Sequence, residues 1–400
     1  MKISDRVGSM TYAIRDVQQV ANQLKEEGHD ILYFNIGDPN KFDFDVPQTM
    51  RDKLAEVANQ RSGYYSESIG DLYVRERIAW YEDAKYHNGV QPSDVIFTNG
   101  VSEGILYLFL SFLNPGDRVL VPGPTYPAYQ SAGTVTQAET VAYRCIEEEG
   151  WIPDINDLRS KITDRTRLII VINPNNPTGS VYSEGVLKQI IDLAGEYDLA
   201  VVSDEIYDRQ ILDEEVKYTS MSTLAKDVPL IVFNGFSKNY LAPGWRAAYT
   251  YKIDQEDRID EPFEGIRKMC RTRLSPTTPI SLASIAGLDL NPPHLKPMLK
   301  KIKERRDLVV KGFNEIERIE TFVPQAAFYI FPKVDLSGTS WKSDRDFVLD
   351  LLREQQTLLV HGSGFSKDYG YDHFRMVYLS TPEILKEGVR RISEFLSSPK

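Results

Sequence analysis

Three apolar, β-branched runs of the chain each end directly before polar residues that could do chemistry. Residues 199–203 precede Asp204 and Tyr207, residues 168–172 precede the segment NPNNPTG (173–179), and residues 230–234 precede Ser237 and Lys238. Because ligands of open α/β sheets bind beyond the carboxyl ends of the strands, we expect these side chains to converge on one edge of a sheet. A lysine amine beside a carboxylate and a phenol is a candidate for covalent and acid–base catalysis. Taken singly, each has an ordinary explanation, such as a helix cap, a tight turn or a solvated lysine.

The pattern that must position these residues lies between residues 90 and 251. Short apolar runs there alternate with longer segments of helical periodicity, which is typical of a mostly parallel sheet covered by helices. Strands are predicted at residues 94–98, 118–121, 168–172, 199–203, 230–234 and 246–251. Apolar residues recur at three- and four-residue spacing from 183 to 197, which predicts an amphipathic helix packed on the sheet. The sequence therefore predicts an α/β fold.

The length of the chain indicates more than one domain. A chain of 400 residues exceeds the size at which one core usually stops growing. Residues 47–290 are predicted to form a large α/β domain, and residues 291–400 a smaller α+β domain to which an N-terminal arm, residues 1–46, contributes. The basic run KKIKERR (300–306) is interpreted as a solvated helix face.

Bulk composition excludes several classes of protein. A net charge of −11 and a pI near 5.2 argue against sequence-independent binding of nucleic acid, which needs clustered lysine and arginine. Cys145 and Cys270 are too few for a disulfide framework and lack metal-ligand spacing, so no metal site is predicted. The sequence contains neither a signal peptide nor an apolar run of about 20 residues, so we expect a cytoplasmic protein without a membrane span.

Specific segments resemble a known family. SKNYLAPGWR (237–246) resembles the S-K-x-x-x-x-x-G-W-R signature of the class I and II aminotransferases, and two further signatures match NPNNPTG and SDEIY (203–207) in that family's order. The segments YAIRDV (12–17), NIGDP (35–39) and VHGSGF (360–365) are similar to its archaeal and bacterial alanine aminotransferase branch. The resemblance implies fold type I, with a mostly parallel seven-stranded sheet between helices in the large domain and a small domain formed by the two chain ends. It also implies pyridoxal 5′-phosphate as the cofactor.

The resemblance assigns roles around this cofactor. Lys238 would form a Schiff base, the internal aldimine, with the cofactor aldehyde and would shuttle a proton during the reaction. Asp204 would pair with the pyridinium nitrogen, which makes the ring an electron sink. Tyr207 and Asn176 would hydrogen-bond the phenolate oxygen, and Tyr126 would stack on the ring.

A second group of residues would bind the cofactor phosphate. The N-terminus of an apolar helix offers the amides of Val101 and Ser102. Ser237 and Arg246 would complete the site, because a guanidinium is suited to bidentate contact with an anion. Tyr65 matches the tyrosine that reaches the phosphate from the neighbouring subunit, which implies a homodimer.

Arg375 would bind the substrate carboxylate, assisted by Gly37 and Asn176. The predicted reaction is a ping-pong transfer of the amino group of an L-amino acid, alanine as the first choice, to 2-oxoglutarate. The alternative is an aspartate aminotransferase or a broad-range enzyme that accepts aromatic and aliphatic donors. A preference for aspartate is less favoured, because Ser102 occupies the position at which some aspartate-specific relatives have lysine. The distal carboxylate of glutamate has three candidate partners: Arg15, Arg271 and Arg273.

Three other functions were weighed against this one. The segment GSGFSK (362–367) resembles a dinucleotide-binding turn, but it lacks the third glycine and does not follow the first βαβ unit. A cofactor-sensing regulator would need a DNA-binding module in addition to the aminotransferase pattern. β-Elimination or decarboxylation on the same cofactor would use Lys238, Asp204 and Arg375 equally well.

Overall fold

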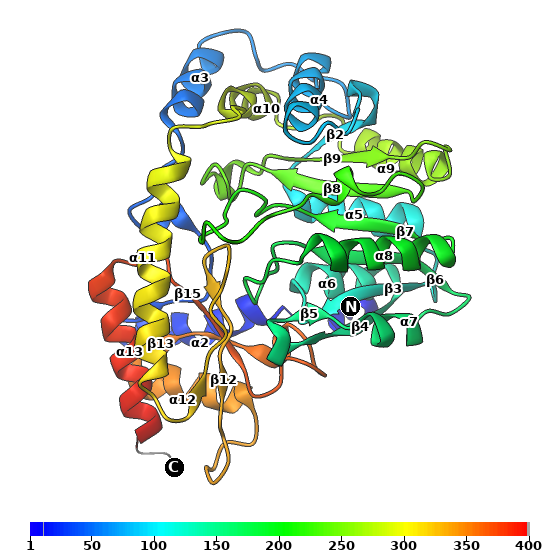
Figure 1. Cartoon of the computed structure of the whole chain (residues 1–400). Coiled ribbons are helices and arrows are strands. Elements are labelled where there is room, and N and C mark those ends of the chain that lie inside the picture. The colour runs from blue at the N-terminus through cyan, green and yellow to red at the C-terminus, as the bar shows by residue number, and fades with distance from the viewer. Residues whose placement is uncertain (11, 398–400) are drawn as a thin grey trace.

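The computed structural model describes residues 1–10 and 12–397. The strands of its largest sheet are β2 (Val95–Thr98), β3 (Arg118–Gly123), β4 (Glu139–Ile146), β5 (Ile152–Pro153), β6 (Thr166–Ile172), β7 (Ala200–Asp204), β8 (Leu230–Gly235) and β9 (Ala248–Ile253). They form one eight-stranded sheet in the order β2-β9-β8-β7-β6-β3-β4-β5 (Figure 1). The six strands predicted from the sequence correspond to β2, β3, β6, β7, β8 and β9.

The direction of these strands confirms the predicted α/β fold with a mostly parallel sheet. The pairs β4–β3, β3–β6, β6–β7 and β7–β8 are parallel, whereas β9 is antiparallel to both β8 and β2. The seven strands that the family resemblance implies are present, and the two-residue β5 adds an antiparallel edge strand beside β4. The carboxyl ends of the parallel strands consequently share one edge of the sheet.

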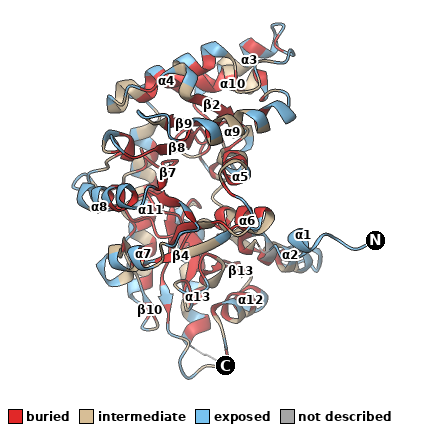
Figure 2. Ribbon diagram, turned by 90° about the vertical axis from the view of Figure 1, so that its right-hand side faces the viewer, coloured by how far each residue is buried: buried red, intermediate tan, exposed pale blue. Residues whose placement is uncertain are grey.

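Helices cover both faces of this sheet. They are α4 (Leu72–Tyr86), α5 (Val101–Phe112), α6 (Pro127–Thr136), α7 (Ile155–Ser160), α8 (Glu184–Glu196) and α9 (Asp260–Thr272). Two further helices, α3 (Gln48–Ala58) and α10 (Thr278–Ser284), pack on each other beyond the β2 edge of the sheet (Figure 1). Successive strand residues alternate between the two faces. In β6, Ile169 and Val171 share a core with Ile190 of α8, whereas Ile170 shares a core with Leu108 of α5. Figure 2 shows this pattern as buried strands beneath helices whose outer faces are exposed.

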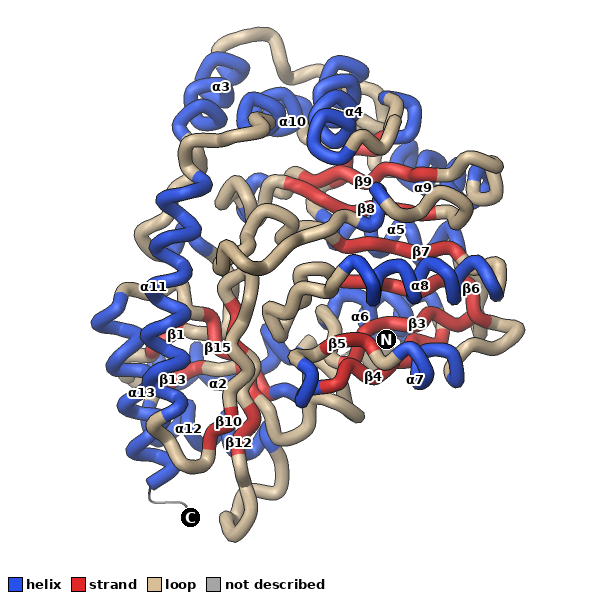
Figure 3. The backbone as a smooth tube through the Cα atoms, in the orientation of Figure 1, coloured by secondary structure: helices blue, strands red, loops and turns tan. Residues whose placement is uncertain are grey.

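The two ends of the chain pack together beside the sheet. Their elements are α1 (Asp5–Gly8), α2 (Ala13–Glu26), β1 (Leu32–Tyr33), α11 (Leu295–Asn314), β10 (Ile319–Glu320), β11 (Tyr329–Ile330), β12 (Lys333–Val334), α12 (Asp344–Gln355), β13 (Thr357–Leu358), β14 (Val360–His361), β15 (Phe374–Val377) and α13 (Pro382–Ser397). Strand β1 pairs in parallel with β13 (Figure 3), and β15 lies between β11 and β14 in a second small sheet. The domain boundaries at residues 46 and 290 stay a prediction.

Short 3₁₀ helices complete the secondary structure. They lie at Pro39–Lys41, Pro92–Asp94, Glu147–Glu149, Met221–Thr223, Pro243–Trp245, Ile285–Gly287 and Gly362–Gly364. The last of these is the glycine-rich segment that resembled a dinucleotide-binding turn. It follows the two-residue strand β14 and opens no α-helix, so it lacks the helix N-terminus that binds a pyrophosphate.

The interpretation of the basic run 300–306 as a solvated helix face is wrong for its last two residues. Arg305 and Arg306 of α11 are buried. Arg305 pairs with Asp43, and Arg306 pairs with Asp213. The carboxylates come from segments far away in the sequence, so the charge pattern of the helix alone gave no sign of them.

Within residues 1–10 and 12–397, the helices lack the combination of length and apolar character that spanning a lipid bilayer requires.

Candidate active site

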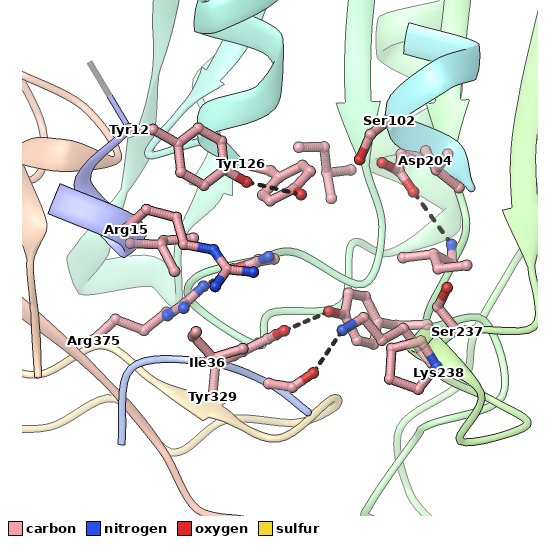
Figure 4. A pocket seen from close by; sticks show the side chains of 18 of the residues that line it. Tyr12, Arg15, Ile36, Ser102, Tyr126, Asp204, Ser237, Lys238, Tyr329 and Arg375 are labelled. Atoms are coloured by element: carbon pink, nitrogen blue, oxygen red, sulfur yellow. Dashed lines mark hydrogen bonds between the residues drawn. The ribbon is translucent and has the colours of Figure 1, made fainter. Parts of the chain in front are cut away.

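A cavity lies where the carboxyl ends of the parallel strands meet the elements of the two chain ends (Figure 4). Every catalytic, cofactor-binding and substrate-binding residue that the family resemblance assigned, with the exception of Tyr65, lines this cavity. The lining comes from the predicted strand ends, from the start of α5 and from β15, so the strand-end argument correctly identified one common edge. Tyr65 lies outside the cavity and is 78% exposed.

Lys238 lies three residues beyond the end of β8. Its Nζ donates a hydrogen bond to the carbonyl oxygen of Gly37 at 3.0 Å, and it lies 5.3 Å from the ring centre of Phe328. The side chain of Gln210 donates to the carbonyl oxygen of Lys238 at 2.8 Å. Gln210 therefore fixes the backbone of Lys238, and Gly37, from the N-terminal part of the chain, holds its amine at the cavity.

Asp204 is the last residue of β7 and is buried. One carboxylate oxygen accepts from the hydroxyl of Tyr129 at 3.0 Å, and the other accepts from the backbone N–H of Ile206 at 3.3 Å. Burial raises the pKa of Asp204 to about 6, although these hydrogen bonds and the charge of Lys238 oppose the shift. A buried carboxylate in this setting is stabilised by a cationic N–H partner.

Tyr207 and Asn176 lie on the side of the cavity nearest to Arg375. The hydroxyl groups of Tyr207 and Tyr329 are 2.8 Å apart and share one hydrogen bond. Burial raises the pKa of Tyr207 well above its ordinary value, so its phenol is neutral at physiological pH and can donate. The side-chain oxygen of Asn176 accepts from Arg375 at 2.9 Å.

Arg375 is a fully buried cation without a counter-ion among the described residues. It donates to Asn176 and, at 2.6 Å, to the carbonyl oxygen of Asn35, while its Nε has no partner. The rings of Tyr329 and Phe365 cover the guanidinium at 4.5 and 4.8 Å. Burial lowers the pKa of Arg375, because a desolvated charge without a counter-ion is costly. A carboxylate bound in the cavity would provide the missing counter-ion.

The N-terminus of α5 forms an anion site at the other end of the cavity. Gly100, at the N-cap, has a φ of +87° and no side-chain cap, so the amides at the start of the helix are open. A Cβ at position 100 would collide with the guanidinium of Arg246. Glycine thus lets Arg246 approach the helix N-terminus, where Val101, Ser102 and Ser237 also line the cavity.

The donor set of the cavity fits pyridoxal phosphate. Four of the lining residues, Arg15, Lys238, Arg246 and Arg375, form no ion pair within the described part of the chain, and the lining contains one carboxylate, Asp204. This excess of positive charge suits a phosphate at α5 and a second anion at Arg375. Asp204 supplies the single negative group, which would suit the protonated ring nitrogen of the cofactor.

The three candidate partners for a distal carboxylate are separated by the structure. Arg15 lines the cavity and lies beside Arg375 in Figure 4. Arg273 instead pairs with Glu103, and Arg271 pairs with Glu264 on the surface of α9. Neither of these two lines the cavity.

Several lining residues were not predicted from the sequence. Tyr12, Ile36 and Tyr329 line the cavity, and Tyr129, which does not, reaches Asp204 from α6. The hydroxyl of Tyr12 donates to that of Tyr126 at 3.0 Å. Tyr12 and Ile36 lie inside the family-like segments YAIRDV and NIGDP, which was the available signal. Tyr329 lies in an apolar strand and carried no signal that separates it from a core residue.

Comparisons with known proteins agree with this geometry. The chain matches the family model of aminotransferase class I and II over residues 29–395. It is 36% identical to the alanine aminotransferase of Mycobacterium tuberculosis (strain ATCC 25618 / H37Rv), over 99% of this chain and 92% of the relative. It is 34% identical to the glutamate-pyruvate aminotransferase AlaA of Escherichia coli (strain K12), over 98% and 97%. The solved structure of an alanine aminotransferase from Pyrococcus furiosus matches with a TM-score of 0.95 and 46% identity, over 99% of this chain and 100% of that one.

The family match covers most of the chain, and it includes every residue that lines the cavity except Tyr12, Ile14 and Arg15. The chain therefore belongs to the class I and II aminotransferases and is a pyridoxal-phosphate-dependent enzyme.

Proposed function

We propose that this enzyme transfers the amino group of L-alanine to 2-oxoglutarate by a ping-pong mechanism. The observation that carries the proposal is Arg375, a buried guanidinium without a counter-ion that faces the same cavity as Lys238. Both an amino acid and a 2-oxo acid have the carboxylate that such a site requires. The names of the relatives from M. tuberculosis, E. coli and P. furiosus favour alanine, pyruvate and glutamate as substrates.

The residues around Lys238 are suited to proton transfer at the substrate α-carbon. Bound pyridoxal phosphate supplies an electron sink for the negative charge that develops there. Lys238 takes the proton from the α-carbon and returns it, and Gly37 holds the amine close to the cavity between these events. Asp204 keeps the ring nitrogen protonated, while Tyr207 and Asn176 donate to the phenolate oxygen. Tyr126 stacks on the ring.

The start of α5 binds the phosphate. The amides of Val101 and Ser102 donate to its oxygens, and the positive end of the helix dipole favours the dianion. Arg246 and the hydroxyl of Ser237 contact the remaining oxygens. Arg375 grips the substrate carboxylate through two N–H groups, with Gly37 and Asn176 beside it.

Arg15 binds the side-chain carboxylate of 2-oxoglutarate and of glutamate. It is the one arginine of the three candidates that lines the cavity. Alanine and pyruvate have no such carboxylate, so this contact forms in one half-reaction only. The placement of Arg15 at a helix start, rather than in the sheet, suits a contact that is made and released in each cycle.

Stoichiometry of the two half-reactions tests the function. The enzyme loaded with pyridoxal phosphate is mixed with L-alanine alone, and pyruvate is measured together with the cofactor absorbance. We expect one pyruvate per site and conversion of the cofactor to its amine form, followed by one glutamate per site when 2-oxoglutarate is added. Absence of cofactor conversion by alanine, together with release of pyruvate and ammonia from L-serine, would instead identify a β-elimination enzyme.

The same measurement separates the candidate donors. A panel of alanine, aspartate, leucine and phenylalanine is compared by the rate of cofactor conversion. We expect alanine to be the fastest donor. Fast conversion by aspartate with none by alanine would overturn the choice of substrate while leaving the aminotransferase intact, and similar rates for all four would identify the broad-range alternative.

We also propose a homodimer in which Tyr65 completes the phosphate site of the partner subunit. Tyr65 is 78% exposed and lies outside its own cavity, and Tyr64, Leu72 and Tyr73 are exposed near it. Four exposed large apolar or aromatic side chains within residues 64–73 are typical of a protein interface. A cytoplasmic location remains a proposal that fits the two free, buried cysteines.

Mixed dimers test the shared site. Lys238→Ala and Tyr65→Ala chains are co-expressed with different tags, and the mixed species is assayed at a cofactor concentration that supports only the wild type. One site of this dimer is then intact at both positions, so we expect about half of the wild-type activity. A Lys238→Ala and Arg246→Ala mixture is the control, because each of its sites has one defect and should remain inactive. Absence of recovery in the first mixture contradicts the proposal.

A further inference from the structure

Tyr329 occupies a central place in the cavity although nothing in the strand pattern distinguished it from a core residue. It is the first residue of β11, whose register places it opposite Val377 of β15, two residues beyond Arg375. The preceding Ala327 has a φ of +62°, which turns the chain directly before this short strand. The side chain of Tyr329 is buried and points into the cavity (Figure 4).

Tyr329 touches three segments of the site at once. Its hydroxyl lies 2.8 Å from that of Tyr207, and its ring lies 4.5 Å from the guanidinium carbon of Arg375. A Cβ at Gly37 would lie 2.5 Å from its hydroxyl oxygen, so Tyr329 is packed directly against the segment whose carbonyl group accepts from Lys238. Tyr329 thus contacts Tyr207, which is proposed to bind the cofactor oxygen, and Arg375, which is proposed to bind the substrate carboxylate. It also contacts the Gly37 segment, which holds the Lys238 amine.

The polarity of the hydrogen bond between the two phenols follows from their surroundings. Each hydroxyl has one proton, so one phenol donates and the other accepts. The cation of Arg375 lies against the ring of Tyr329, whereas no such contact to the ring of Tyr207 is found among the described residues. A cation at the ring withdraws electron density from the phenol and makes it the stronger donor. Tyr207 then accepts from Tyr329, and its own proton is free to point into the cavity.

We propose that Tyr329 is a positioning residue that acts through Tyr207 and Arg375. Its hydroxyl donates to Tyr207, which directs the proton of Tyr207 at the phenolate oxygen of the cofactor and strengthens that hydrogen bond, since donors in a chain polarise one another. Its ring covers Arg375 and keeps the guanidinium in the orientation that grips a carboxylate. The inference rests on the proposed roles of Tyr207 and Arg375.

A pH titration of the cofactor absorbance tests the hydroxyl. In Tyr329→Phe the ring remains and one hydrogen bond is lost. Tyr207 then donates less strongly, so the phenolate oxygen retains more negative charge and holds the proton that it shares with the Lys238 nitrogen more tightly. We expect the apparent pKa of the cofactor absorbance to rise by about half a unit in the loaded enzyme. The KM for alanine should change by less than about twofold, because the ring still covers Arg375.

A double-mutant cycle isolates the contact. In a Tyr207→Phe background, Tyr329→Phe should cause no further rise of that pKa, because the group through which it acts is absent. Tyr143→Phe is the matched control, since it removes another buried hydroxyl, one that donates to the carbonyl oxygen of Ile170 at 2.9 Å and does not line the cavity. We expect the control to leave the pKa of the cofactor unchanged.

Tyr329→Leu tests the ring. It removes the hydroxyl and the cover of Arg375 together, so the KM for both alanine and 2-oxoglutarate should rise about fivefold above that of Tyr329→Phe. An equal KM in the two variants would show that the ring does not position Arg375.

Two results overturn the hydroxyl part of the inference. An unchanged pKa in Tyr329→Phe, with a raised pKa in Tyr207→Phe, would reduce Tyr329 to a packing residue while the proposed function stands. A lowered pKa would mean that Tyr207 donates to Tyr329 and that the contact competes with the cofactor. If the loaded wild-type enzyme has an absorbance that does not respond to alanine, the proposed function fails before Tyr329 is tested.

Discussion

Two buried groups of polar side chains meet near Lys238, and they differ in how their charges are balanced. The first, which we call the carboxylate cluster, consists of Glu82, Lys85 and Asp208. Lys85 Nζ lies 2.9 Å from Glu82 and 2.8 Å from Asp208. All four carboxylate oxygens accept hydrogen bonds, from Lys85 and from four further side chains: Tyr86, Asn239, Tyr249 and Tyr251.

The second group is the active-site cavity, where the cations are not balanced by carboxylates. Arg375 is 1% exposed and so more deeply buried than Lys85, but its partners are an amide oxygen and a backbone carbonyl oxygen, and its Nε has none. Lys238 donates to a backbone carbonyl group. The carboxylate cluster thus uses its hydrogen-bonding capacity within the fold, whereas the cavity retains capacity for a ligand.

The two groups are also connected. Asn239, which follows Lys238, donates to Asp208 at 2.6 Å. The carboxylate cluster therefore fixes the turn that carries Lys238. The comparison predicts that substitutions in the cluster reduce stability, whereas substitutions in the cavity reduce activity.

The largest effect is expected for Lys238→Ala. Turnover should fall by at least about 10⁴-fold, because both the covalent attachment and the proton transfer depend on the amine. The free energy of unfolding without cofactor should stay within about 0.5 kcal/mol of the wild type, since no ion pair is lost. Steady-state kinetics and urea denaturation measure the two quantities. Turnover near the wild-type value would remove the central role of Lys238.

The next largest effect is expected for Lys85→Met. Burial alone would lower the pKa of Lys85, but the carboxylates of Asp208 and Glu82 more than reverse this, so its charge is held in the fold. Removal of the lysine leaves two buried carboxylates unpaired, which should lower the free energy of unfolding by about 3–5 kcal/mol. Turnover of the folded fraction should fall by less than about tenfold.

A surface pair provides the control for Lys85→Met. Lys188 forms an ion pair with Glu184 on α8, and both side chains are about half exposed. Lys188→Met should therefore change the free energy of unfolding by less than about 0.5 kcal/mol. Equal stability of the two variants in urea denaturation would contradict the view that the carboxylate cluster stabilises the fold.

Arg375→Lys is expected to lower kcat/KM about 100-fold for both alanine and 2-oxoglutarate. Lysine keeps the charge but loses the planar pair of N–H groups that grips a carboxylate. Single-turnover rates of the two half-reactions measure the effect. The thermal unfolding temperature of the cofactor-free enzyme should be unchanged or slightly higher, because lysine has fewer buried N–H groups that need a hydrogen-bond partner than arginine has. A loss confined to one substrate would contradict a shared carboxylate site.

The sequence predicted those parts of this arrangement that depend on local pattern. Lys238, Asp204 and Asn176 follow three strands, and parallel strands place their carboxyl ends together, so convergence could be expected before the fold was known. Strand β4 was missed because its sequence, ETVAYRCI, interrupts the apolar residues with Glu139, Thr140 and Arg144 and does not form a continuous apolar run.

Other parts depend on contacts between distant segments. Arg375 and Tyr329 reach the cavity only because β15 and β11 pack beside the large sheet, and the role of Arg375 was inferred from the family resemblance alone. The close packing of β8 on β9 is another such contact: a Cβ at Gly235 would lie 2.7 Å from the Cβ of Ala248. The glycine that this close approach requires is on β8.

The smallest effect is expected for Arg15→Met, which tests whether Arg15 and Arg375 bind different carboxylates of the substrates. The half-reaction with 2-oxoglutarate should slow by about 10–30-fold in kcat/KM, because a partly exposed charge pair with the distal carboxylate is lost. The half-reaction with alanine should change by less than twofold, since alanine has no distal carboxylate. Arg271→Met, outside the cavity and paired with Glu264, should leave both rates unchanged. Equal losses with both substrates would mean that Arg15 supports the site as a whole, and the cavity would then have one specific anion contact for substrate, at Arg375, rather than two.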